Sequence, residues 1–101
     1  NDIFLRFNQT VFTFKQPQQA IRIEFDAICL GKNEGLIVLH NKINSEFFIT
    51  GKVKFTLHGP GTNKIAIDLI VSHPCEIDLD GLITVEYGKT QLKMSQTIKI
   101  E

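Results

Sequence analysis

Apolar and polar residues alternate with a period of two through nearly the whole chain, and this pattern limits what the chain can fold into. Between residues 20 and 29, apolar side chains at the odd-numbered positions alternate with Arg22, Glu24 and Asp26. Successive side chains of a β-strand point to opposite faces, so this run predicts a strand with one face in a core and the other in water. No stretch has the apolar spacing of three and four residues that a packed helix needs. The sequence therefore predicts an all-β protein.

Further strands are predicted at intervals of roughly 8 to 12 residues, with turn-forming residues between them. They cover the ranges 3–7, 11–15, 36–39, 47–57, 64–71, 82–87 and 92–100. The run 36–39 is wholly apolar, as expected of a central strand covered on both faces. Gly51 interrupts the range 47–57 and predicts a bulge or a crossing between sheets. About seven to eight such strands are typical of an antiparallel immunoglobulin-like β-sandwich.

Length and charge narrow the class of protein. The 101 residues support one domain over 1–101 with one core, and 43% hydrophobic residues are enough to fill it. Eleven basic and eleven acidic side chains give no net charge, whereas nucleic-acid binding calls for a basic excess. No apolar run approaches the roughly 18 to 20 residues of a membrane span. We expect neither a nucleic-acid partner nor direct membrane insertion, and the ends, which fall inside predicted strands, suit a fragment of a larger chain.

Two cysteines, Cys29 and Cys75, leave two cellular settings open. In a secreted protein they would bridge the two sheets, and in a cytosolic protein they would be reduced core or rim residues. The sequon Asn8-Gln9-Thr10 gives weak support to secretion. We favour the reduced state.

Residues that could carry catalysis are present but poorly arranged. Ser72, His73 and Asp78 supply the residue types of a Ser–His–Asp triad. Neighbours along a strand point to opposite faces, so Ser72 and His73 are poorly placed to share a proton. The glycines of Gly59-Pro60-Gly61 lack the spacing of a phosphate loop and predict a turn. We expect no enzymatic activity and no cofactor.

Glu76, Asp78 and Asp80 alternate, so in an extended segment they project from one face. Their oxygens would suit calcium, which takes several oxygen ligands. The other interpretation, which we favour, is a solvated acidic edge that discourages pairing with another sheet. Ile77 and Leu79 then pack in a short edge piece or loop. We predict no metal site.

Several short segments along the chain have the order and spacing of a known family. They are Asp2-Ile3-Phe4-Leu5-Arg6-Phe7, Val11-Phe12-Thr13-Phe14, Ile21-Arg22-Ile23, Leu30-Gly31, Asn41-Lys42, Phe47-Phe48 and Leu82-Ile83-Thr84-Val85-Glu86-Tyr87-Gly88. In this order they resemble the sandwich subdomain of the alpha-adaptin appendage, or ear, of the plasma-membrane clathrin adaptor. The resemblance covers essentially the whole chain and depends on the order and spacing of these segments. It implies an immunoglobulin-like sandwich that recruits endocytic accessory proteins through short peptide motifs.

The resemblance also implies a location and a peptide site. Such domains act in the cytoplasm at membrane coats, within a multisubunit adaptor complex, and in alpha ears a platform subdomain follows the sandwich. A side groove of the family's sandwich takes WxxF-like motifs, using an aromatic residue before the Asn-Lys turn and an amide side chain on a later strand. The matching positions here are Leu39 and His40, together with Thr62 and Asn63. Leu39 stands where the family has an aromatic residue.

The leading hypothesis is therefore a protein-interaction module of a clathrin-adaptor large subunit. The alternative is a secreted or surface immunoglobulin-like adhesion or ligand-binding domain. That alternative needs Cys29 and Cys75 to be bridged and Asn8 to be glycosylated. The state of the two cysteines separates the two hypotheses.

Overall fold

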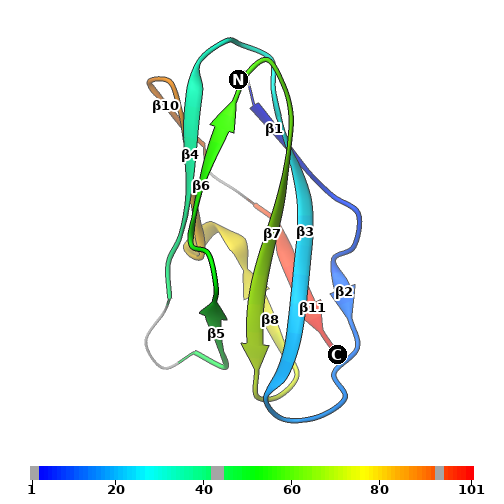
Figure 1. The fold of residues 1–101 in the computed structure, drawn as a ribbon. Coiled ribbons are helices and arrows are strands. Elements are labelled where there is room, and N and C mark those ends of the chain that lie inside the picture. The colour runs from blue at the N-terminus through cyan, green and yellow to red at the C-terminus, as the bar shows by residue number, and fades with distance from the viewer. Residues whose placement is uncertain (1–2, 42–44, 93–94) are drawn as a thin grey trace.

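Strands make up most of the computed structural model, which describes residues 3–41, 45–92 and 95–101 (Figure 1). The strands are β1 (Ile3–Phe7), β2 (Val11–Phe12), β3 (Gln19–Cys29), β4 (Glu34–Leu39), β5 (Phe47–Thr50), β6 (Lys54–His58), β7 (Gly61–Val71), β8 (Cys75–Asp78), β9 (Ile83–Tyr87), β10 (Thr90–Leu92) and β11 (Thr97–Ile100). A single turn of 3-10 helix, η1 (Leu79–Gly81), joins β8 to β9. The predicted all-β class is confirmed.

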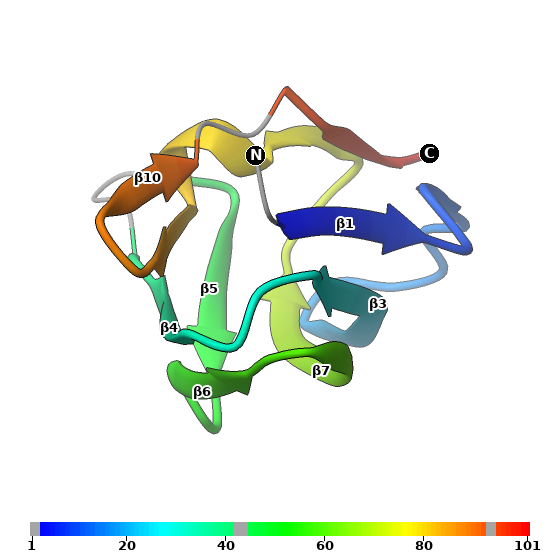
Figure 2. The ribbon, with the colours of Figure 1, turned by 90° about the horizontal axis from the view of Figure 1, so that it is seen from above.

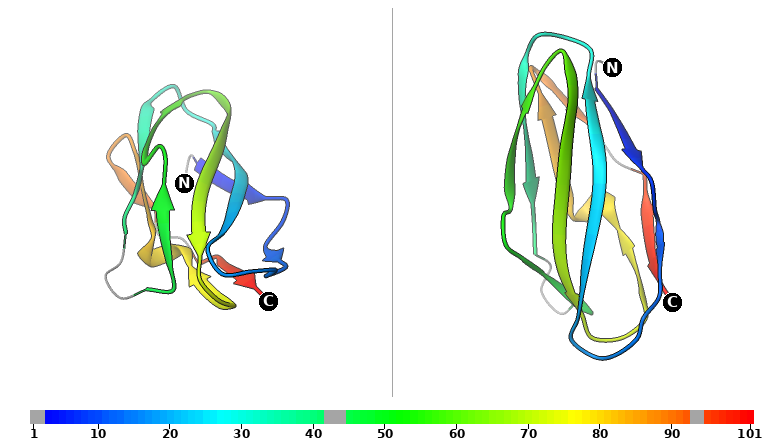
Figure 3. Two further views of the ribbon diagram at one scale, coloured as in Figure 1. Left: turned by 60° about the horizontal axis from the view of Figure 1, so that its bottom comes forward. Right: turned by 45° about the vertical axis from the view of Figure 1, so that its right-hand side comes forward.

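The strands form three sheets around one interior (Figures 2 and 3). The β3–β7 sheet has the order β1-β3-β7-β5, the β4–β9 sheet has the order β10-β9-β4-β6, and the β8–β11 sheet has the order β2-β11-β8. Neighbouring strands are antiparallel except β2 and β11, which are parallel. Buried apolar side chains from all three sheets meet in one cluster, so the protein has a single core in a sandwich-like arrangement.

The longest ladder joins β3 to β7 over eleven residue pairs, from Gln19 opposite Val71 to Cys29 opposite Gly61. The odd-numbered residues of both strands point inward: those from Ile21 to Cys29 and from Ile65 to Val71 are all buried. The period-two alternation predicted these inward faces, and the structure confirms them. Each isoleucine or leucine moved from water into such a core contributes roughly 1.5 to 3 kcal/mol.

Several details differ from the sequence prediction. The described part of the chain has eleven strand segments instead of seven to eight, because 47–57 and 92–100 each contribute to two sheets and Cys75–Asp78 pairs with β11. The strand predicted over 11–15 is shorter and ends at Phe12. The strand at 36–39 is buried on one face and only half-buried on the other, so it is not covered on both faces as predicted. Residues 42–44 of the loop after Asn41 and residues 93–94 lie outside the described residues.

Gly51 marks a crossing between sheets, as one of the two sequence interpretations held. Before it, β5 pairs with β7, and after it, β6 pairs with β4. Its φ is +76°, in the left-handed region that favours glycine. The crossing leaves Val53 exposed, although alternation had placed it with buried Phe55 and Leu57.

The turn between β6 and β7 packs tightly against the turn between β3 and β4. The Tyr87 hydroxyl donates a hydrogen bond to the carbonyl of Gly31, which ties the end of β9 to the β3–β4 turn. Gly59 lies against both partners, and a side chain there would overlap the Gly31 carbonyl and the Tyr87 hydroxyl. These contacts close one end of the molecule.

We predict that Gly51→Ala lowers the free energy of unfolding by about 1 kcal/mol, because an L-residue is strained at this positive φ. A methyl group at this position meets only Asp68 Oδ2 at 3.5 Å, an ordinary contact, so the cost is conformational and not steric. Asn tolerates the left-handed region, so Gly51→Asn should lose less stability than Gly51→Ala. Urea denaturation measures both, and equal losses for the two variants would contradict the prediction.

Candidate functional site

Leu39 and His40, the first predicted pair of site residues, lie at the end of β4. Leu39 is only 5% exposed and belongs to the core, so its side chain offers little surface to a ligand. Its N–H donates to the carbonyl of Val53 at 2.8 Å. His40 is exposed, and its Nε2 lies 2.8 Å from the hydroxyl of Thr84.

Thr62 and Asn63, the second predicted pair, lie at the start of β7. Thr62 is exposed on the outer face of its sheet. The Asn63 amide is taken up by the fold: its Oδ1 accepts from the N–H of His58 at 2.9 Å, and its Nδ2 donates to the carbonyls of His58 and Ala27 at 3.0 and 3.2 Å. Through these hydrogen bonds, Asn63 stabilises the β6–β7 turn and ties it to β3.

The structure does not bring the two pairs together. Asn63 is bonded to His58, which lies opposite Glu34 at the start of β4, whereas Leu39 lies at the far end of β4. Five residues of strand span about 17 Å, and the pairs belong to different sheets. The two aromatic residues of an extended WxxF motif are about 10 Å apart, so one motif cannot contact both pairs.

The outer face of the β3–β7 sheet carries exposed apolar side chains that the sequence reasoning did not assign to a site. Phe4 is 54% exposed and lies opposite Ile28, and we call these two residues the Phe4 row. At the other end of the face, Ala20, Ile70 and Phe48 lie side by side on β3, β7 and β5, and we call them the Phe48 row. The available signal was an apolar residue at an otherwise polar position of the alternation. Phe4, Ile28, Leu30 and Phe48 are the apolar residues that stand at such positions in the sequence.

Ion pairs separate the two apolar rows. Arg6 Nη2 lies 2.7 Å and Lys64 Nζ 3.6 Å from the two oxygens of Asp26, and Arg22 Nε lies 3.0 Å from Asp68 Oδ1. The Asp26 side chain is only 10% exposed. The hydrogen bond from Arg6, helped by the charge of Lys64, lowers the pKa of Asp26 although burial opposes the shift. Asp26 is thus held ionised between two basic side chains.

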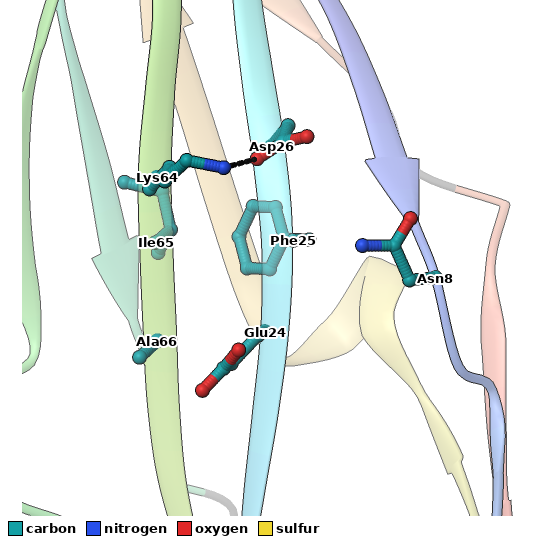
Figure 4. A pocket seen from close by; sticks show the side chains of 7 residues that line it. All are labelled: Asn8, Glu24, Phe25, Asp26, Lys64, Ile65 and Ala66. Atoms are coloured by element: carbon teal, nitrogen blue, oxygen red, sulfur yellow. Dashed lines mark ion pairs between the residues drawn. The ribbon is translucent and has the colours of Figure 1, made fainter.

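A hollow of about 290 Å³ lies beside this charge cluster (Figure 4). Asn8, at the end of β1, forms one wall and turns its amide nitrogen toward β3, while Glu24 and Asp26 project from β3 and Lys64 from β7. Ala66 lies opposite Glu24 in the ladder, and its small side chain leaves the space open. The hollow is open and its lining is mixed, with polar groups beside Phe25, Ile65 and Ala66, which suits a peptide side chain better than an enclosed apolar ligand.

The candidate catalytic residues are engaged separately. The Ser72 hydroxyl accepts from Gln18 Nε2 at 3.4 Å, and His73 Nδ1 lies 3.1 Å from the carbonyl of Pro74. The Asp78 carboxylate accepts from the N–H of Asp80 at 3.0 Å and caps η1. Glu76 extends toward Lys99, 3.9 Å away, on the neighbouring strand. In residues 3–41, 45–92 and 95–101, no group of three or more His, Cys, Asp or Glu side chains is placed to hold a metal ion.

The two cysteines lie near opposite ends of the longest ladder. Cys29 is opposite Gly61 at one end, and Cys75 follows four residues after Val71, which is opposite Gln19 at the other end. The ends are about 33 Å apart, and four residues reach at most about 14 Å. A disulfide needs Cα atoms within about 7 Å, so Cys29 and Cys75 cannot be bridged within one molecule. Both are free thiols, and burial raises their pKa values.

Comparison with models of protein families, with curated proteins and with solved structures finds no match to this chain. Among the described residues, no helix is long and apolar enough to cross a bilayer.

We predict that Asn63→Ala lowers the free energy of unfolding by about 1 to 3 kcal/mol, because it leaves backbone groups of His58 and Ala27 without their side-chain partner. Thr62→Ala, one residue away and exposed, is the matched control and should change stability by less than about 0.5 kcal/mol. Urea denaturation compares them. If Asn63→Ala is as stable as the control, its hydrogen bonds do not hold the turn.

We also predict an acid-sensitive contribution from Asp26. The pKa of its carboxyl is lower in the folded protein than in the unfolded chain, so its stabilisation is complete above the unfolded pKa and is lost as pH falls through the folded pKa. The free energy of unfolding should therefore drop more steeply below about pH 4 in the wild type than in Asp26→Asn. Asp68→Asn, which removes the more exposed pair with Arg22, is the control and should keep the steep drop. Parallel pH curves for wild type and Asp26→Asn would contradict the prediction.

Proposed function

We propose that this domain is a protein-interaction module of the clathrin-adaptor appendage type, which recruits endocytic accessory proteins through short aromatic peptide motifs. The observation that carries the proposal is the outer face of the β3–β7 sheet. It presents exposed aromatic side chains, Phe4 at 54% and Phe48 at 47%, on either side of a charged band. Aromatic anchors of a peptide pack on such apolar rows, while polar groups fix its orientation.

The proposal includes an immunoglobulin-like sandwich, and the strand order supports it. A β1-β3-β7-β5 sheet opposes a β10-β9-β4-β6 sheet, and the chain after β1 changes sheet to run parallel to the last strand. The proposal further includes a cytoplasmic location at membrane coats, within a multisubunit adaptor complex. The free and distant thiols of Cys29 and Cys75 support that setting, since the secreted alternative required them to be bridged.

Affinity for one motif is expected to be weak. A peptide of about five residues buries far less than the roughly 1,200 to 2,000 Å² of a stable protein interface. Many motifs on one accessory protein, or many domains on one coat, would raise the overall affinity by effective concentration. Weak single contacts therefore suit a module that assembles and disassembles with a coat.

Titration of the isotope-labelled domain with WxxF and DPF-type peptides, followed by NMR, tests the proposal. We expect saturable amide shifts on one contiguous surface, with dissociation constants between micromolar and millimolar. Peptides with alanine in place of the aromatic residues are the controls and should leave the spectrum unchanged. Absence of shifts with either motif at millimolar peptide would overturn the proposed function.

A further inference from the structure

One edge of β3 is paired over only part of its length. The β1–β3 ladder runs from Ile3 opposite Cys29 to Phe7 opposite Phe25, and there the chain leaves the sheet toward β2 (Figure 3). On its other edge β3 pairs with β7 over all eleven residues. In the described part of the chain, the segment Ala20–Glu24 therefore has a strand on one side alone. We call this segment the β3 window.

The neighbouring ladders show which backbone groups point out of the window. In an antiparallel pair, hydrogen-bonded and non-hydrogen-bonded positions alternate. The N–H of Ser72 donates to the carbonyl of Glu46 at 3.1 Å and extends the β5–β7 ladder, so the even-numbered residues of β7 bond to β5 and the odd-numbered ones to β3. The odd-numbered residues of β3 accordingly bond to β7. The N–H and C=O groups of Ala20 and Arg22 then face the open edge.

Both ends of the β3 window are closed. The pair Phe7–Phe25 closes one end, with the two rings stacked at 4.6 Å. The side chain of Gln19 closes the other: its Nε2 donates to the carbonyl of Thr13 at 3.1 Å, and its Oε1 accepts from the N–H of Lys15 at 2.6 Å. The open length between these contacts is about 17 Å, which matches an extended segment of about five residues.

Open space adjoins the window on both sides. The hollow of Figure 4 lies over the outer face, and a second hollow of about 280 Å³ lies between β3 and the start of β2. Asn8 and Glu24 line both hollows. Gln9 and Phe12 line the second one together with Arg22 and Glu24, so an added strand would find one polar and one apolar neighbour on the side toward β2.

We propose that the β3 window docks a short extended peptide, which adds as a strand antiparallel to β3 and carries a basic residue opposite Glu24 and an aromatic residue opposite Ala20. This inference rests on the proposed function of peptide recognition, and it specifies the place and the chemistry. Main-chain hydrogen bonds to Ala20 and Arg22 hold the peptide, and alternate side chains select it. The direction continues that of β1, which occupies the same edge farther along.

The basic residue follows from the charges at the window. Arg22 is paired with Asp68, and Arg6 and Lys64 are both paired with Asp26. Within the described residues Glu24 takes part in no ion pair, and it lines both hollows. The charge of Arg22 acts on Glu24 without forming an ion pair with it, because the Arg22 guanidinium is bound to Asp68. A lysine or arginine opposite Glu24 therefore meets a carboxylate that forms no ion pair with another described side chain.

The aromatic residue follows from the Phe48 row. Ala20 is exposed, and Ile70 beside it is half-buried, so a ring opposite Ala20 covers both. On an added strand, the positions opposite Glu24, Arg22 and Ala20 share the outer face. The predicted motif has five residues: a basic residue, any residue, a small residue, any residue and an aromatic residue. The small residue lies opposite Arg22, where a larger side chain would collide with the Arg22–Asp68 ion pair.

A second copy of this chain fits the window poorly. Residues 8–10, where the chain leaves β1 for β2, flank one end of the window, and the loop at 13–18 flanks the other. Only about five residues of β3 are open between them. An edge strand that brings a folded domain with it would meet these flanking segments. A short peptide that is not attached to a folded domain meets no such obstacle.

The test uses the heptapeptide Gly-Lys-Val-Ser-Val-Trp-Gly and the isotope-labelled domain. We expect NMR shifts centred on Ala20–Glu24 and slower hydrogen exchange at the amide of Arg22. The amide of the peptide serine faces β3 in the proposed register, so its N-methylation should weaken binding at least about ten-fold through the lost hydrogen bond and the added clash. N-methylation of the next valine, whose amide points away, is the matched control and should change binding less than about two-fold.

Charge reversal tests the contact with Glu24. Glu24→Lys should weaken the heptapeptide about five-fold, and a peptide with glutamate in place of lysine should restore binding to this variant. Glu86→Lys, on the outer face of the β4–β9 sheet, makes the same change away from the window and should leave binding unchanged.

The outcomes separate this inference from the proposed function. If WxxF or DPF peptides bind but the amides of the β3 window do not respond to the heptapeptide, or if both N-methylated peptides bind alike, the window proposal is wrong and the proposed function stands. If only the heptapeptide binds at the window, the window proposal stands and recruitment through WxxF or DPF motifs is wrong. If no peptide binds at millimolar concentration, both fail. Concentration-dependent shifts at the window without peptide would assign it to self-association and overturn the proposal.

Discussion

The eleven-residue ladder between β3 and β7 is the interaction on which the rest of the structure depends. It sets which side chains of the two longest strands enter the core, and Ile23 and Ile67, paired next to its centre, are fully buried. A slip of one residue would move both into water and bring charged neighbours inside. Because many buried apolar groups oppose that slip, the register is strongly determined.

The same register determines the chemistry of the outer face. Arg22 and Asp68 are 46 positions apart in sequence, yet the ladder places them directly opposite each other, and it does the same for Asp26 and Lys64. The charged band and the two apolar rows are therefore products of strand pairing. One carboxylate, Glu24, faces the small side chain of Ala66 and forms no ion pair in the described part of the chain, where only the charge of Arg22 acts on it. The register of the ladder thus leaves the carboxylate of Glu24 available to a basic residue of a partner.

The period-two pattern was sufficient to predict the all-β class and the inward faces of β3 and β7, because these depend on local alternation. At Gly51 the sequence left a bulge and a crossing between sheets open, and the structure shows the crossing. The pattern was not sufficient for the candidate site. The family resemblance grouped Leu39 with Asn63, although they lie near opposite ends of β4, because a resemblance in sequence does not say which ends of two strands meet. The role of Asn63 was also hidden, since its need to satisfy His58 appears only once the β6–β7 turn is folded. The β3 window could not be read from the sequence either, because it arises where β1 leaves its neighbour.

The departure of β1 from β3 also bears on solubility. A fully unpaired edge of β3 would present eleven residues rich in isoleucine, a length that can template stacking with other chains. In the structure, β1 covers one half of this edge. Gln19 and residues 8–10 close the two ends of the other half, so the open part is too short to nucleate stacking with other chains. The remaining edge is thus long enough to pair with a short peptide, as proposed, but too short for the stacked strands of an aggregate.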